Sequence, residues 1–175
     1  MTTVTKRWGK AMNPEVIKQS VQLWTNEPEK ARVSPVVKAR TDGAQAVVEA
    51  GPFSWRTDVP PTLGGENKAA SPTALLLGAL GGCAAVFIRD TLAPQLGVRV
   101  DSVQAEVKCK ADFRGLLGMS GASPELENLE ITIQIQSPES EESVQALYRA
   151  WLDRCPVYLA LTKPLTVNTA LTKSA

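Results

Sequence analysis

The chain has 175 residues, of which 43% are hydrophobic and 21% are charged, and it contains three cysteines and no histidine. This length fits one domain with a hydrophobic core, and the composition is typical of a globular protein. Without histidine there is no Ser-His-Asp or Cys-His catalytic pair and no histidine-ligated metal site. A net charge of +1 argues against a nucleic-acid-binding protein.

Residues 1–32 are predicted to form a basic, partly helical arm, and residues 33–175 a single domain. Residues 1–40 carry eight basic and three acidic side chains, a pattern that usually belongs to a solvated surface. Asn13-Pro14-Glu15 is typical of a helix start. Met1–Met12 lacks the apolar core of a secretory signal, so we expect a cytoplasmic protein. Apolar residues follow the helix start at helical spacing: Val16, Ile17, Val21 and Trp24.

Three short β-strands are predicted next, at Val33–Ala39, Ala44–Ala50 and Phe53–Asp58. The sequence Thr41-Asp42-Gly43 is a turn signal that would join the first two strands as a hairpin. The segment Val59–Ala70 is rich in proline and glycine, and we expect it to be a loop.

An apolar helix is predicted to begin at Ser71-Pro72, where serine caps the helix and proline takes its first position. It should end at Thr91 or Leu92, before Pro94. Its charge-free run is short for a bilayer span, so we expect no membrane insertion. A helix that is apolar on nearly all faces must be covered, by its own sheet with or without a second subunit.

The last part of the chain alternates again between strand and helix patterns. Strands are predicted from Val103 to Phe113 and from Leu129 to Ile135, joined by Gly115–Pro124. A helix should begin at Ser137-Pro138-Glu139 and continue to Cys155.

Pro156 should break that helix, and a shorter one should follow to Thr162. A final strand is predicted at Leu165–Thr169. The order β-β-β-α-β-β-α-β describes an α+β domain.

The three cysteines differ in context. Cys109 lies on the apolar face of a strand and fits a buried hydrophobic residue. Cys83 follows Gly81-Gly82 inside a helix, where each glycine costs about 1 kcal/mol. These glycines allow either a close backbone approach around an inert cysteine or an uncovered thiol. Cys155 precedes a helix start that would favour its thiolate, but it also continues an apolar stripe. The sequence contains no C-x-x-C motif, so we expect no structural zinc site.

Three segments together resemble the OsmC/Ohr family, which contains osmotically inducible and organic-hydroperoxide-resistance proteins. They are Gly65-Glu66-Asn67, the run from Ser71-Pro72 to Leu80-Gly81-Gly82-Cys83, and Arg154-Cys155-Pro156-Val157. The resemblance covers about residues 33–170. It implies an intertwined α+β homodimer with two buried central helices and with active sites at the subunit interface.

The resemblance also implies a role for each cysteine. Cys83 would attack a hydroperoxide and become a sulfenic acid, and Cys155 would resolve it as a Cys83–Cys155 disulfide. A dithiol or lipoyl group would then reduce the disulfide, with no cofactor and no metal. An arginine would stabilise the thiolate: Arg40 is the best match, offset by one residue from the family's Arg-Asp-Gly pattern, and Arg56 is the reserve candidate.

One position departs from the family pattern. Family members usually carry a glutamate one or two residues after the helix-starting proline, and here those positions are Thr73 and Ala74. Glu66 is the nearby acid. The leading hypothesis is a thiol-dependent organic hydroperoxide reductase. The alternatives are an OsmC-like dimer without efficient peroxidase activity that binds an apolar small molecule at the subunit interface, and a protein whose cysteines are inert.

Overall fold

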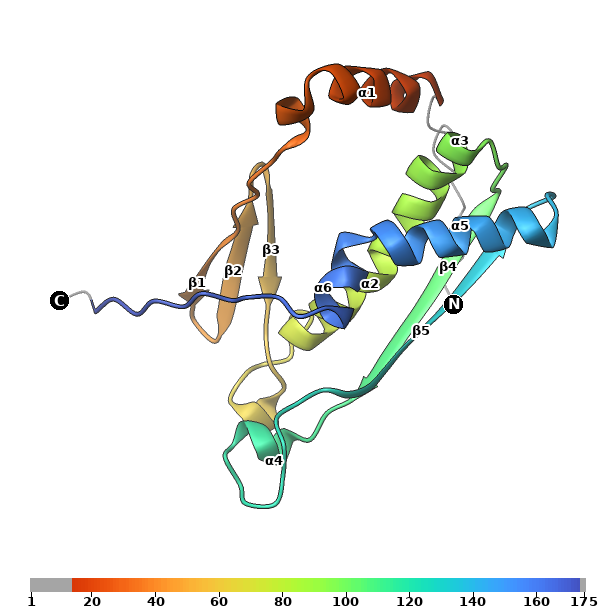
Figure 1. Ribbon diagram of the computed structural model, residues 1–175. Coiled ribbons are helices and arrows are strands. Elements are labelled where there is room, and N and C mark those ends of the chain that lie inside the picture. Colours follow the sequence, from red (N-terminus) through yellow and green to blue (C-terminus); the bar gives the residue numbers. More distant parts are fainter. Residues whose placement is uncertain (1–13, 174–175) are drawn as a thin grey trace.

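The computed structural model describes residues 14–173, and it confirms the α+β class. A three-stranded sheet and a long two-stranded ribbon are joined through a central helix (Figure 1). Residues 1–13, including the predicted cap at Asn13 and the basic residues at the start of the arm, lie outside the described residues.

The arm contains the predicted helix. Helix α1 spans Pro14–Asn26 and is followed by a 3-10 turn at Pro28–Ala31. It lies against α3 at the far end of the central helix (Figure 1). The apolar side chains of α1 remain largely uncovered, with 42–48% of Val16, Val21, Leu23 and Trp24 exposed.

The first sheet is an antiparallel meander of β1 (Lys38–Asp42), β2 (Gln45–Ala50) and β3 (Phe53–Thr57). The second and third strands agree with prediction, but β1 lies later than Val33–Ala39. The hairpin turn falls at Gly43-Ala44, where Gly43 has φ of +64°. Because Pro35 has no N–H to donate, the segment before Lys38 does not extend the ladder.

The central helix α2 spans Pro72–Phe87 and begins as predicted. The Ser71 hydroxyl caps it by accepting a hydrogen bond from the backbone N–H of Ala74. The helix continues past the predicted end through a π-helical segment, Ile88–Leu92, into α3 (Ala93–Leu96). The wider π turn accommodates Pro94 inside the helix, and Gly97 ends it.

Two long strands form the second sheet, β4 (Ser102–Lys110) and β5 (Glu127–Gln136), which pair antiparallel. The first strand stops three residues before the predicted end at Phe113. The Asp112 carboxylate caps the short helix α4 (Phe113–Leu116) by accepting from the Arg114 backbone N–H, so the chain turns there.

Helices α5 (Glu141–Arg154) and α6 (Pro156–Thr162) follow, with the break at Cys155-Pro156 as predicted. The start of α5 was predicted at Ser137-Pro138, but Ser140 is the cap. The Ser137 hydroxyl instead donates to a backbone carbonyl in the loop before β4.

The predicted final strand at Leu165–Thr169 is wrong for this chain. Residues 163–173 form no strand, and Leu165 and Val167 are 67% and 74% exposed. The segment keeps the alternating apolar pattern of a strand, but the described part of the chain offers no strand with which it pairs.

The core lies between the central helix, α5 and the inner face of β4–β5. Its buried side chains come from the two helical layers, and the apolar face of the ribbon packs against them. The buried residues are Leu80, Ala84, Ile88, Leu92, Ala93, Leu147, Ala150, Trp151 and Cys155. The three-stranded sheet stands apart from this core (Figure 1).

The helical run Pro72–Leu96 is long and apolar enough to cross a membrane by length and composition, with a mean hydropathy of 1.6 over its most apolar stretch. Only 22% of that stretch is buried within the described chain. The predicted absence of membrane insertion therefore depends on what else covers this helix.

Candidate functional site

Cys83 lies on the edge of the central helix. Leu80 and Ala84, its neighbours on α2, point into the core and are fully buried, whereas Cys83 is half-buried. A helical residue three positions from Leu80 and one from Ala84 is turned toward the border of the core face. The Cys83 side chain therefore packs against the core and remains partly exposed.

Cys155 occupies the junction between α5 and α6 and is fully buried. Its backbone N–H donates to the Trp151 carbonyl and ends α5, and Pro156 starts the next helix. The Cys155 sulfur accepts a hydrogen bond from the backbone N–H of Tyr158 at 3.4 Å. The thiol is thus the N-terminal cap of α6, the position that the Cys-Pro sequence indicates.

The structure brings these two thiols together. The Cys83 and Cys155 sulfur atoms are 2.9 Å apart although 72 positions separate the residues in the sequence. One thiol donates a hydrogen bond to the other, and either can be the donor. A disulfide, with an S–S bond of about 2.05 Å, would need a small further approach of the two sulfurs.

The surroundings hold Cys83 in its thiol form. Burial, followed by the hydrogen bond and charge interaction with Cys155, raises the pKa of Cys83 to about 12. The backbone N–H of Val157, at the start of α6, donates to the Cys83 sulfur and is the opposing influence that lowers this pKa. Among residues 14–173, no ion pair or hydrogen bond joins Cys83 to an arginine or lysine side chain.

The two candidate arginines lie together on the three-stranded sheet, and within residues 14–173 neither is hydrogen-bonded to Cys83. Cross-strand pairing places Arg40, Val47 and Arg56 side by side on one face of the three-stranded sheet. The Arg56 guanidinium is held by the Asp42 carboxylate at 2.7 Å and by the Gln45 side-chain oxygen at 3.0 Å. Within residues 14–173, Arg40 makes no such contact.

The opposite face of this sheet is apolar. Val48 and Trp55 lie side by side there, and Thr41 and Thr57 flank Ala46 in the next row. Because side chains alternate across a strand, an offset of one residue moves a side chain to the other face. In the Arg-Asp-Gly pattern the arginine directly precedes the aspartate, and here Thr41 occupies that position. Thr41 therefore lies on the apolar face of the sheet, while Arg40 lies on the polar face. The role of Arg40 stays a prediction.

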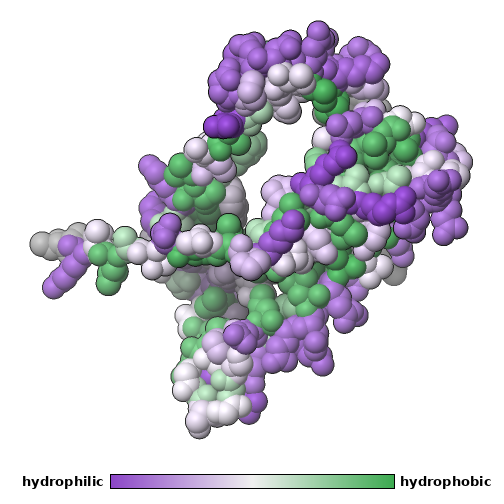
Figure 2. Space-filling view, in the orientation of Figure 1, coloured by the Kyte–Doolittle hydropathy of each residue, from purple (hydrophilic) through white to green (hydrophobic). Residues whose placement is uncertain are grey.

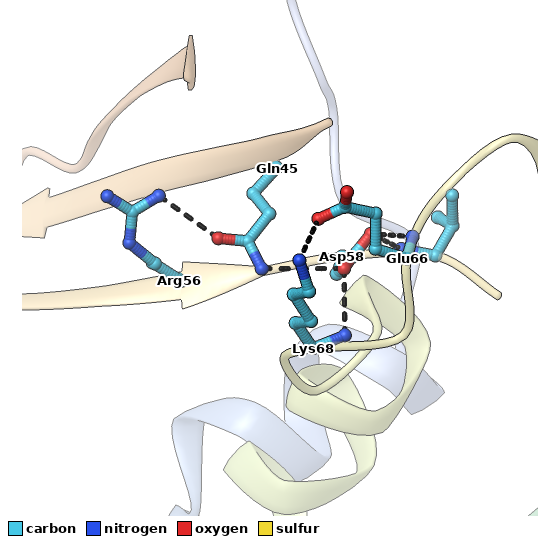
Figure 3. Close-up of polar contacts among 6 residues, drawn as sticks. Gln45, Arg56, Asp58, Glu66 and Lys68 are labelled. Atoms are coloured by element: carbon cyan, nitrogen blue, oxygen red, sulfur yellow. Dashed lines mark hydrogen bonds and ion pairs between the residues drawn. The ribbon is translucent and has the colours of Figure 1, made fainter. Parts of the chain in front are cut away.

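Sequence reasoning missed Asp58, which organises the loop between β3 and α2. The carboxylate is 97% buried, and it accepts hydrogen bonds from the backbone N–H groups of Val59, Glu66 and Lys68. Gln45 adds a fourth from its side-chain amide at 3.4 Å and also accepts from Arg56 (Figure 3). These donors, led by the Lys68 amide, hold the pKa of Asp58 below its ordinary value despite burial.

Gly65 is the sequence signal that could have revealed this arrangement. A Cβ at this position would overlap the Val59 carbonyl oxygen and lie 2.5 Å from an Asp58 carboxylate oxygen. Only glycine lets the loop close around Asp58. The Lys68 ammonium pairs with Glu66 across the same loop at 2.8 Å, and within residues 14–173 no ion pair joins Glu66 to Arg40 or Arg56 (Figure 3).

A shallow groove of about 380 Å³ runs between α2 and β4, lined by Ala74, Leu77, Gly78, Gly81, Gly82, Ala105 and Val107. A Cβ on Gly81 would lie 3.2 Å from a methyl group of Val107, so this glycine allows the ribbon to approach the helix. Gly78 and Gly82 face open space. Cys109 is half-buried at an irregularity of the β4–β5 pairing.

The OsmC-like protein family matches residues 65–170 of the sequence. This chain belongs to the OsmC-like family. An OsmC-like protein from Mycoplasma pneumoniae superposes with a TM-score of 0.62 at 19% identity, over 74% of this chain and 88% of that one. An organic hydroperoxide resistance protein from Elizabethkingia anophelis superposes with a TM-score of 0.54 at 19% identity, over 74% and 88%. No curated protein matches the sequence.

These similarities confirm the OsmC-like fold that the sequence motifs predicted. The family match begins at Gly65 and contains both α2 and α5, so Cys83 and Cys155 lie inside it. Helix α1 and the three-stranded sheet lie before it, and the boundary at residue 32 stays a prediction.

Proposed function

We propose that this protein is a thiol-dependent reductase of organic hydroperoxides. The observation that carries the proposal is the 2.9 Å approach of the Cys83 and Cys155 sulfurs, one half-buried and the other fully buried. Membership of the OsmC-like family and the fold shared with an organic hydroperoxide resistance protein support it.

In the proposed reaction the deprotonated Cys83 sulfur attacks one oxygen of the O–O bond, which breaks. The alkoxide leaves and takes up a proton as the alcohol, and Cys83 becomes a sulfenic acid. The Cys155 thiol then attacks the Cys83 sulfur, and the sulfenic oxygen leaves as water, which yields the disulfide. A small dithiol, such as a lipoyl group, regenerates the two thiols by exchange.

Cys83 must lose its proton before the first step, and a pKa near 12 makes that loss costly at neutral pH. The Val157 N–H is the stabilising contact that the chain itself offers to the thiolate. The face of α2 next to Cys83 is open, so it has room for a second copy of the chain. A cationic side chain of that copy would favour the thiolate.

We propose that the protein is a homodimer in which the second copy covers this face. Large apolar side chains are exposed on separate elements, including Phe53 and Trp55 of the sheet, Val86 of α2, and Leu165 and Val167 of the tail. Figure 2 shows hydrophobic surface on several of these elements. A bilayer would cover the helix but not the sheet and the tail, whereas an intertwined copy can cover all three.

Turnover tests this function. Reduced protein is supplied with a lipoyl dithiol and either cumene hydroperoxide or hydrogen peroxide, and peroxide consumption is followed. We expect faster consumption of cumene hydroperoxide, lost in both Cys83→Ser and Cys155→Ser and kept in Cys109→Ser. Consumption that persists in Cys83→Ser would overturn the proposal.

A second candidate function is favoured by the raised pKa of Cys83 and by the groove beside Gly78 and Gly82. In this alternative the dimer binds an apolar small molecule and turns over peroxide poorly. Protection of Cys83 from alkylation by a long-chain acyl compound, without peroxide consumption, would support it.

A further inference from the structure

The Cys83–Cys155 pair has a geometry that suits a second kind of chemistry, one that does not rest on peroxide reduction. Both sulfurs are thiols in contact with each other, and no group of three or more His, Cys, Asp or Glu side chains in residues 14–173 could hold a metal ion. A tetrahedral zinc site, which takes four protein ligands, is therefore not supported by the donors present.

The sulfur–sulfur distance selects among acceptors that need only two thiols. A linear two-coordinate metal ion, with bonds to sulfur of about 2.3 Å, would need sulfurs about 4.6 Å apart. Bonds of about the same length meeting near a right angle hold the sulfurs about 3.3 Å apart. The observed 2.9 Å is close to the second value and far from the first. The fitting acceptor is a pyramidal atom that brings its own third substituent.

The space beside Cys83 is suited to an organic substituent. Cys155 is fully buried, so a ligand must enter on the side of Cys83, which is half-buried. On the same edge of α2, Leu76 and Val86 are apolar, and this chain leaves 37% and 57% of them uncovered, so a ligand that enters here lies between α2 and the proposed second copy. A hydrocarbon group carried by the acceptor would pack on this apolar surface.

We propose that Cys83 and Cys155 form a chelating site for trivalent arsenic compounds that carry one organic group, such as arylarsine oxides. Each thiol forms one sulfur–arsenic bond, the arsenic–oxygen bonds break, and both thiol protons leave with the oxygen as one water molecule. Arsenic stays trivalent and neither sulfur is oxidised, so the step needs no oxidant or reductant. The arsenic keeps its organic group as the third substituent.

The test uses reduced full-length protein and phenylarsine oxide, with binding followed by intact-mass spectrometry and by titration of free thiols. We expect one equivalent to bind, to block two thiols, and to be removed by 2,3-dimercaptopropanol. Holding two thiols in one site should raise affinity about 10²–10⁴-fold over a single thiol. Cys83→Ser and Cys155→Ser should lose this gain, and Cys109→Ser should keep it.

Two results would overturn the proposal. One is that the wild-type protein binds no more tightly than Cys83→Ser or Cys155→Ser, and the other is that binding depends on Cys109. Melting curves of the variants show whether each one is folded, so loss of binding is not confused with loss of structure. Arsenical binding and peroxide consumption are separate readouts on the same variants. Failure of one leaves the other standing.

Discussion

Oxidation of the Cys83–Cys155 pair should make the protein markedly more heat-stable. The disulfide would close a chain segment that spans 72 positions, from the central helix to the junction of α5 and α6. Chain-entropy estimates for a loop of this length give about 4 kcal/mol of stabilisation. For a chain of this size each kcal/mol raises Tm by about 2–4 °C, so we expect an increase of about 8–16 °C.

The measurement is differential scanning calorimetry on protein reduced with a dithiol and on protein oxidised with one equivalent of cumene hydroperoxide. Cys109→Ser should show the same increase, because Cys109 takes no part in the bond. Cys155→Ser should show none. If peptide mapping finds the Cys83–Cys155 bond but Tm rises by less than about 3 °C, the bond distorts the fold, and the thiols are not poised as the structure describes.

Three further predictions concern the surroundings of the site. Gly65→Ala should displace the loop from Asp58, lower Tm and speed hydrogen exchange of the Glu66 amide, and unchanged exchange would contradict the steric argument. Because burial raises the pKa of Cys83, its alkylation rate should rise about tenfold per pH unit up to about pH 12; a plateau below pH 9 would contradict this. Gly78→Ala adds a methyl group that meets nothing among residues 14–173, so it should stabilise a monomer by about 1 kcal/mol but weaken a dimer that packs on this face. Sedimentation velocity across a concentration series measures self-association of the variant. Undiminished self-association would contradict the idea that a second copy covers Gly78.

Local signals in the sequence were sufficient for the elements that carry the two cysteines. Ser71-Pro72 is a cap followed by a first-turn proline, and the chain folds there as those residues dictate. The Cys155-Pro156 break depends on the missing N–H of proline, which is also a local property. These two boundaries were therefore readable from the sequence, whereas Ser137-Pro138 and Pro94 misplaced the start of α5 and the end of the central helix.

Features that depend on distant partners could not be read in the same way. The register of β1 is set by pairing with β2, and the sequence alone placed the strand several residues too early. Asp58 gains its role from amides as far away as Lys68, which no spacing rule connects to it. The segment after Lys163 has a strand pattern but no strand, because pairing needs a neighbour that residues 14–173 do not provide.

The two arginines illustrate the same limit at the site. Arg40 and Arg56 were candidates because of their position in the sequence, and which face of the sheet they occupy follows from pairing with Val47. Their shared polar face and the Asp42–Arg56 ion pair became visible only in three dimensions.

Peptide mapping after brief treatment with cumene hydroperoxide shows whether Cys83 and Cys155 react with peroxide as a pair. Reduced protein is exposed to one equivalent, remaining thiols are blocked, and the digest is analysed by mass spectrometry under non-reducing conditions. We expect a peptide pair joined by Cys83 and Cys155, together with an alkylated Cys109. Three alkylated cysteines after an excess of the peroxide would contradict it.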